Sequence, residues 1–141
     1  MPASWKRWGP HPNAPGRHTV ISGLVAGRRG EVETGIDMIR RGILLFRTIR
    51  GYQGLAGLVR QVFEEWAELE LARGNPDRAT TLLAGADQLL RGSKRLPHIQ
   101  AAFDDREARA SALLTPEDFH QAWQRGSAFS FDELVDFATE S

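Results

Sequence analysis

The chain contains no cysteine, which excludes disulfide bridges, thiolate metal sites and cysteine nucleophiles together. It also has no apolar run approaching the roughly 18 residues of a membrane-spanning helix, and its basic N-terminus lacks the apolar core of a secretion signal. We therefore expect neither a membrane anchor nor export. The absence of cysteine is compatible with a reducing compartment, and a cytoplasmic location is the expectation.

Net charge is also absent, because 18 Lys and Arg residues balance 18 Asp and Glu residues. A balanced chain lacks the basic footprint of most nucleic-acid-binding proteins, so no direct nucleic-acid partner is expected. The charges are nevertheless uneven: residues 1–50 carry nine basic and three acidic side chains, whereas residues 51–141 carry nine and fifteen. The two parts could attract each other within one fold, or the second could present an acidic surface to a partner.

Side-chain constellations for catalysis or metal binding are scarce. The four histidines occur singly, without the spacing of four that places two ligands on one helix face. No serine lies in the Gly-x-Ser-x-Gly turn of a nucleophile elbow. Asp104, Asp105 and Glu107 are clustered, but the cluster is more typical of a solvated helix face than of a cation loop. We therefore predict no catalytic residue, metal site or cofactor.

The periodicity of apolar residues predicts an all-α protein of 141 residues with a single domain. Residues 1–17 hold four prolines and no periodicity, so we expect a poorly ordered leader followed by one domain over 18–141. Glycine and proline then divide the chain. Two helix pairs are expected over 18–92 and further helices over 98–139, among them a last helix capped by Ser130 with Glu133 in a capping box.

The segment 55–73 shows the clearest amphipathic pattern. Its apolar stripe contains Phe63, Trp66 and four or more aliphatic residues at helical spacing. We expect the opposite side to be an exposed, acidic strip that contacts a protein or peptide partner, and its acidity predicts a basic one. The predicted partner-binding residues are Gln61, Glu64, Glu65 and Glu68.

An internal repeat appears when the chain is compared with itself at an offset of 44 residues. Turn, small and large apolar positions all recur in this register, which predicts a helix-turn-helix unit used twice. Small residues let two antiparallel helices approach closely, while large ones fill the space between successive pairs. The matched positions include Gly30 with Gly74, Gly35 with Ala79, Ile39 with Leu83, and Gly42 with Ala86.

The second unit resembles the tetratricopeptide repeat in residue type and spacing, at Phe63, Trp66, Ala67, Gly74, Ala79, Leu83 and Ala86. This resemblance implies antiparallel helix pairs in a short right-handed solenoid, closed by C-terminal capping helices, with a concave surface for partners. Two positions depart from the repeat. Glu70 stands where an aromatic is preferred, and Arg91 stands near the usual closing proline.

The C-terminal half is similar to the helical-repeat region of bacterial ATPase-containing transcriptional regulators of LuxR and AfsR type. The residues that carry this likeness are 71–79, 82–86, Phe119, Ala122, Trp123, Gly126, 129–133 and Ala138. It implies a non-catalytic interaction or regulatory module. A phosphate-binding Gly-x-x-x-x-Gly-Lys loop and a basic recognition helix are both absent from the sequence, so ATPase activity and DNA binding are not carried over.

Two alternatives remain open at this point. One is a small-molecule effector pocket between the helix pairs and the C-terminal helices, near Trp66, Phe103 and Trp123. The other is self-association into a homo-oligomer, because a short solenoid leaves its end faces uncovered.

Overall fold

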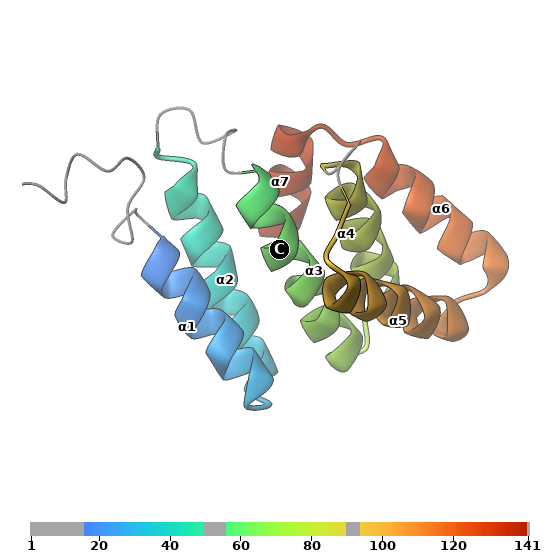
Figure 1. The fold of residues 1–141 in the computed structure, drawn as a ribbon, viewed down its shortest axis with the longest axis horizontal. Helices are drawn as coiled ribbons and strands as arrows, with labels where there is room; N and C mark the ends of the chain where they lie inside the picture. The colour runs from blue at the N-terminus through green and yellow to red at the C-terminus, as the bar shows by residue number, and fades with distance from the viewer. Residues whose placement is uncertain (1–15, 50–55, 90–93, 141) are drawn as a thin grey trace, which may run out of the picture.

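The computed structural model describes residues 16–49, 56–89 and 94–140, and every regular element within these ranges is an α-helix (Figure 1). The predicted all-α class is confirmed. The predicted leader falls almost wholly outside the described residues, except that Arg17 already opens the first helix. The seven helices of the described ranges are α1 (Arg17–Arg28), α2 (Val32–Phe46), α3 (Ala56–Ala72), α4 (Pro76–Gln88), α5 (Pro97–Leu113), α6 (Pro116–Ser127) and α7 (Phe131–Thr139).

The turns that join α1 to α2 and α3 to α4 share one geometry. Gly30 has φ 89° and Gly74 has φ 86°, a left-handed conformation that glycine adopts at little cost. One residue later, the backbone N–H of Glu31 donates to Ala26 at 3.0 Å and that of Asn75 donates to Glu70 at 2.8 Å. Both bonds obey the 44-residue offset, so the repeat seen in the sequence is also present in the backbone.

Small residues set the close contact of α1 with α2. A Cβ atom added to Gly23 would lie 2.8 Å from the Gly35 carbonyl oxygen, and one added to Gly35 would lie equally close to the Gly23 carbonyl. The residue matched to Gly35 in the second pair, Ala79, is fully buried. Both pairs therefore use a small side chain in the same register, as the repeat predicts.

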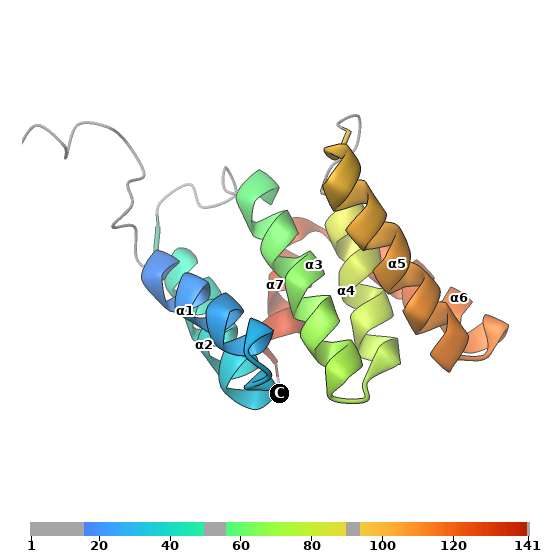
Figure 2. The same cartoon turned by 60° about the horizontal axis from the view of Figure 1, so that its bottom comes forward.

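The remaining helices do not form a third pair of the same kind. Helix α6 packs most closely on α4, where a Cβ added to Gly126 would lie 2.2 Å from the Thr81 carbonyl oxygen. Helix α7 contacts both α2 and α4 on the side away from α1, α3 and α5 (Figure 2). The C-terminal helices thus cover α4 while α1, α3 and α5 share one exposed side.

The predicted start signal of the last helix is confirmed. Ser130 and Glu133 form the capping box of α7, with bonds of 3.1 and 2.9 Å. Asn75 occupies the N-cap position of α4 without a side-chain capping bond; its amide instead donates to the Glu70 carboxylate at 3.3 Å. None of the seven helices described is both long and apolar enough to cross a membrane.

Candidate protein-interaction face on helices α1, α3 and α5

Helix α3 carries the four residues predicted to form an exposed acidic strip, and the structure separates them. Gln61, Glu65 and Glu68 lie on the outward stripe of the helix, at spacings of four and three. Glu64 points to a different side and is 0% exposed. The prediction of exposure is therefore wrong for Glu64, because α3 is flanked by other helices on more than one side.

Glu64 belongs to a buried ion-pair network. Arg60 Nη1 donates to Glu64 Oε2 at 2.7 Å, and Arg95, which precedes α5, donates through Nε at 3.1 Å. Arg95 also binds Asp87 of α4 at 2.9 Å and stacks over the Phe103 ring at 3.9 Å. A carboxylate buried this completely needs such partners. Glu64 therefore joins α3, α4 and α5 and is not accessible to another protein.

Of the two residues that depart from the tetratricopeptide pattern, Arg91 lies outside the described residues, and Glu70 is also 0% exposed. Its carboxylate accepts hydrogen bonds from the Trp66 indole at 3.1 Å and from Arg78 Nε at 2.9 Å. Arg78 continues to the carbonyl of Ala138 at 2.6 Å, near the end of α7. The carboxylate in place of an aromatic ring thus links the α3–α4 turn to the last helix.

The three aromatic residues of the alternative effector pocket serve as core side chains. Trp66 is fully buried and stacks on Phe63 with 6.1 Å between the ring centroids. Its indole N–H donates a hydrogen bond to the Glu70 carboxylate. Phe103 and Trp123 contact each other edge to face at 6.3 Å. These contacts place the three rings in or against the core, and the effector pocket stays a prediction.

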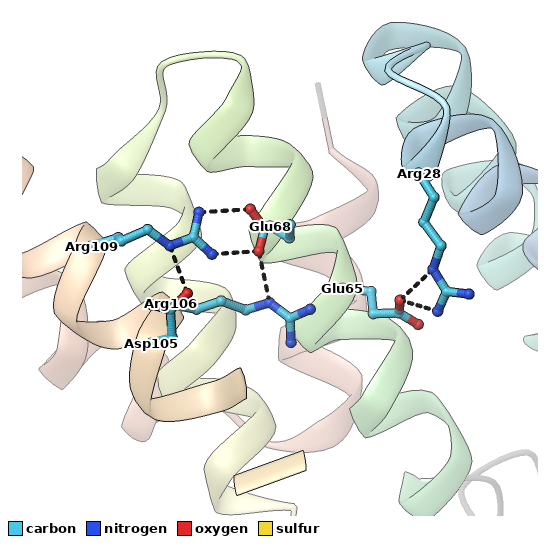
Figure 3. A network of polar contacts seen from close by, with 6 residues as sticks. All are labelled: Arg28, Glu65, Glu68, Asp105, Arg106 and Arg109. Carbon is cyan, nitrogen blue, oxygen red and sulfur yellow. Dashed lines mark hydrogen bonds and ion pairs between the residues drawn. The ribbon is translucent and has the colours of Figure 1, made fainter. Parts of the chain in front are cut away.

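Glu65 and Glu68 are bound by arginines from neighbouring helices (Figure 3). Arg28 of α1 reaches Glu65 through Nε at 3.2 Å and through Nη2. Arg109 of α5 holds Glu68 with both terminal nitrogens, one of them at 2.8 Å, and Arg106 adds its Nε at 3.2 Å. The outward carboxylates of α3 therefore meet guanidinium groups on both sides.

The hydrogen bond from Arg109 is the largest influence on Glu68 and lowers the pKa of its carboxyl group, although partial burial acts in the opposite direction. The same interaction raises the pKa of Arg109. Both groups are consequently charged at neutral pH, and their bidentate pair is of the stronger, charge-assisted type.

Two hollows lie on either side of Glu68. The first, which we call the polar hollow, measures about 130 Å³; Leu24, Gly27 and Leu69 line it together with Arg28, Glu65, Glu68 and Arg106. The second, the apolar hollow, measures about 420 Å³ and is lined by Leu71, Ala72, Ala112 and Leu113, with Glu68 and Arg109 at its border. Leu113 is 62% exposed at its edge. We call the surface containing both hollows and the stripe of Gln61, Glu65 and Glu68 the interaction face.

Sequence reasoning found the α3 members of this face but missed the arginines that complete it. Arg106 and Arg109 are three residues apart, a spacing that places both on one side of α5, and this was the available signal. The position of Arg28 against α3 follows from tertiary structure alone. Within the described ranges, no group of three or more histidine or acidic side chains is arranged to hold a metal ion.

No known family model matches the chain, and neither a curated protein nor a solved structure matches it significantly.

Proposed function

We propose that the protein is a non-catalytic interaction module that binds another protein through the interaction face. The observation that carries this proposal is the pair of hollows separated by the Glu68–Arg109 ion pair. One hollow is small and lined by charged as well as apolar residues, and the other is larger, apolar and open, so together they suit two neighbouring side chains of one polypeptide segment.

The composition of the face supports a protein partner over a small molecule. Arginine is enriched at protein interfaces, and an exposed leucine such as Leu113 adds apolar contact area. The polar hollow, at about 130 Å³, is smaller than the roughly 300 Å³ at which drug-sized ligand pockets begin, and the apolar hollow, at about 420 Å³, is open to solvent with the exposed Leu113 at its edge.

The biological setting rests on the resemblance of the C-terminal half to bacterial LuxR- and AfsR-type regulators. On that basis we propose a cytoplasmic signalling or transcriptional regulator as the context, in which the module senses a partner protein.

A displayed library of random 12-residue peptides tests the proposed binding face. Peptides selected on the wild-type protein should lose binding to Leu113→Asp, because the charge enters the apolar hollow. They should keep binding to Leu96→Asp, a matched control, since Leu96 is 60% exposed before the first turn of α5 and thus at the other end of that helix. Selected peptides that bind both variants equally, or a selection that yields no binder, would contradict the proposal.

A further inference from the structure

The polar hollow contains unused hydrogen-bond donors. A guanidinium group carries five N–H bonds, of which Nε holds one and the two Nη atoms hold four. Arg106 uses Nε on Glu68, whereas its Nη atoms have no hydrogen-bond or ion-pair partner among the residues that the structure describes. Its side chain is only 15% exposed, so these donors are directed into a partly enclosed space. Figure 3 shows them between Glu68 and Glu65.

The acceptors around this space are largely occupied. Both oxygens of Glu68 accept from Arg109, and Oε1 accepts from Arg106 as well. Oε1 of Glu65 accepts from Arg28 twice. Two arginines and two glutamates line the hollow, but its unpaired atoms are mostly donors: both Nη atoms of Arg106 and Nη1 of Arg28, against Oε2 of Glu65, have no partner among the described residues. The nearby Asp105 pairs with the far side of Arg109 at 2.9 Å and is 65% exposed.

We propose that the polar hollow binds the carboxylate of an acidic side chain of the partner through the Nη atoms of Arg106. The methylene groups of that side chain would rest on Leu24 and Leu69, and a large apolar side chain of the same segment would enter the apolar hollow. The partner segment is thus acidic and amphipathic. This inference rests on the proposed function and replaces the basic partner expected from the sequence.

The opposite charge fits the hollow poorly. A lysine of the partner would approach Arg28 and Arg106; it would find both Glu68 oxygens already bound and only Oε2 of Glu65 unpaired. Breaking the bidentate Glu68–Arg109 pair to free them removes charge-assisted hydrogen bonds, while an incoming carboxylate requires no such exchange. The excess of unpaired donor nitrogens therefore favours an acidic segment.

Three pools of fluorescein-labelled 12-residue peptides provide the probe. Each peptide has an alanine-glutamine framework with one leucine and one test residue. The test residue is Glu, Gln or Lys according to the pool, and within a pool its distance from the leucine varies over all positions. Fluorescence anisotropy should show the Glu pool binding the wild-type protein about tenfold tighter than the Gln pool, as expected for a charge-assisted hydrogen bond. The Lys pool should bind most weakly.

Variants then assign the preference to Arg106. Arg106→Met keeps the side-chain bulk and should remove the advantage of the Glu pool, while Arg106→Lys, which keeps a point charge, should restore part of it. Arg125→Met is the matched control, because Arg125 lies on α6 and pairs with Asp77 at 3.5 Å, away from the interaction face. It should bind like the wild type. If Arg106→Met fails to fold, Arg28→Met serves instead, since Arg28 is 69% exposed, and it should weaken the Glu pool about threefold.

Equal or tighter binding of the Lys pool, no binding of the Glu pool, or an unchanged preference in Arg106→Met would overturn the inference. These outcomes are distinct from failure of the proposed function. Library peptides that bind the wild type, lose binding to Leu113→Asp and lack acidic residues would leave the interaction face in place and reject only the acidic partner.

Discussion

Helix α3 has two faces that carry glutamates with opposite roles. Glu64 and Glu70 are enclosed: Glu64 pairs with Arg60 of the same helix and with Arg95 before α5, and Glu70 pairs with Arg78 of α4. Glu65 and Glu68 lie on the interaction face, where their arginine partners are partly exposed to solvent. All four residues fall within seven positions of one helix, so their place in the sequence does not separate the two roles. The burial of each carboxylate and the element that supplies its arginine partner do.

The difference has a simple energetic basis. Removing one partner from a buried ion pair leaves the other charge in a medium that cannot solvate it, which costs roughly 3–5 kcal/mol. Removing one partner from an exposed pair leaves a charge that water solvates, with a typical cost of about 0–1 kcal/mol. Truncating an enclosed glutamate should therefore destabilise the fold far more than truncating an outward one.

The largest effect is expected for Glu64→Ala. The substitution leaves Arg60 and Arg95 buried without their shared carboxylate, so urea denaturation should show a loss of about 3–5 kcal/mol. A loss below about 1 kcal/mol would indicate that Glu64 behaves like the exposed glutamates and would erase the contrast between the two faces.

Arg78→Ala should be the next most damaging change. It removes a partner of buried Glu70 and the bond to the Ala138 carbonyl, with an expected cost of about 2–3 kcal/mol. Since Arg78 also tethers the end of α7, hydrogen exchange of the α7 amides should accelerate more than that of α1. Uniform acceleration in both helices would contradict a specific link between Glu70 and α7.

Glu68→Ala should cost about 1 kcal/mol, and the loss should shrink in 1 M salt because the pair is partly exposed. Its pKa is lowered in the folded state, so the stabilisation is complete above the unfolded-state pKa and disappears as the pH falls through the lower, folded-state value. Wild type and variant should therefore converge in acid. A difference that persists at the lowest pH would exclude ionisation as its source.

Glu65→Ala should have the smallest effect, within about 0.5 kcal/mol, because its partner Arg28 is mostly exposed. The thermal midpoint measures this directly. A destabilisation as large as that of Glu64→Ala would show that the α1–α3 contact depends on this ion pair and would place Glu65 with the enclosed glutamates.

The sequence is informative where structure depends on nearby residues. The glycine turns at Gly30 and Gly74 and the capping box of Ser130 with Glu133 require only contacts within a few positions, and both are present. The small residues at Gly35 and Ala79 follow from the repeat. These signals are local or periodic, which is why they can be read before the structure is known.

The burial of Glu64 could not be predicted from the sequence in the same way. An amphipathic pattern distinguishes one buried side from one exposed side, but α3 contacts α1, α2, α4 and α5. Its exposed stripe is therefore narrower than the polar half of the helix. Oε2 of Glu64 accepts from Arg95, which lies 31 residues away along the chain, and no local rule connects the two.

The most direct test of the account follows the arginine side-chain Nε–H signals by NMR while the Glu peptide pool is added. We predict that the signal of Arg106 shifts, followed by those of Arg28 and Arg109, while the signals of the enclosed Arg60 and Arg95 and of Arg125 on α6 stay in place. Shifts at Arg60, Arg95 or Arg125 with an unmoved Arg106 would contradict the division of α3 into an enclosed face and an interaction face.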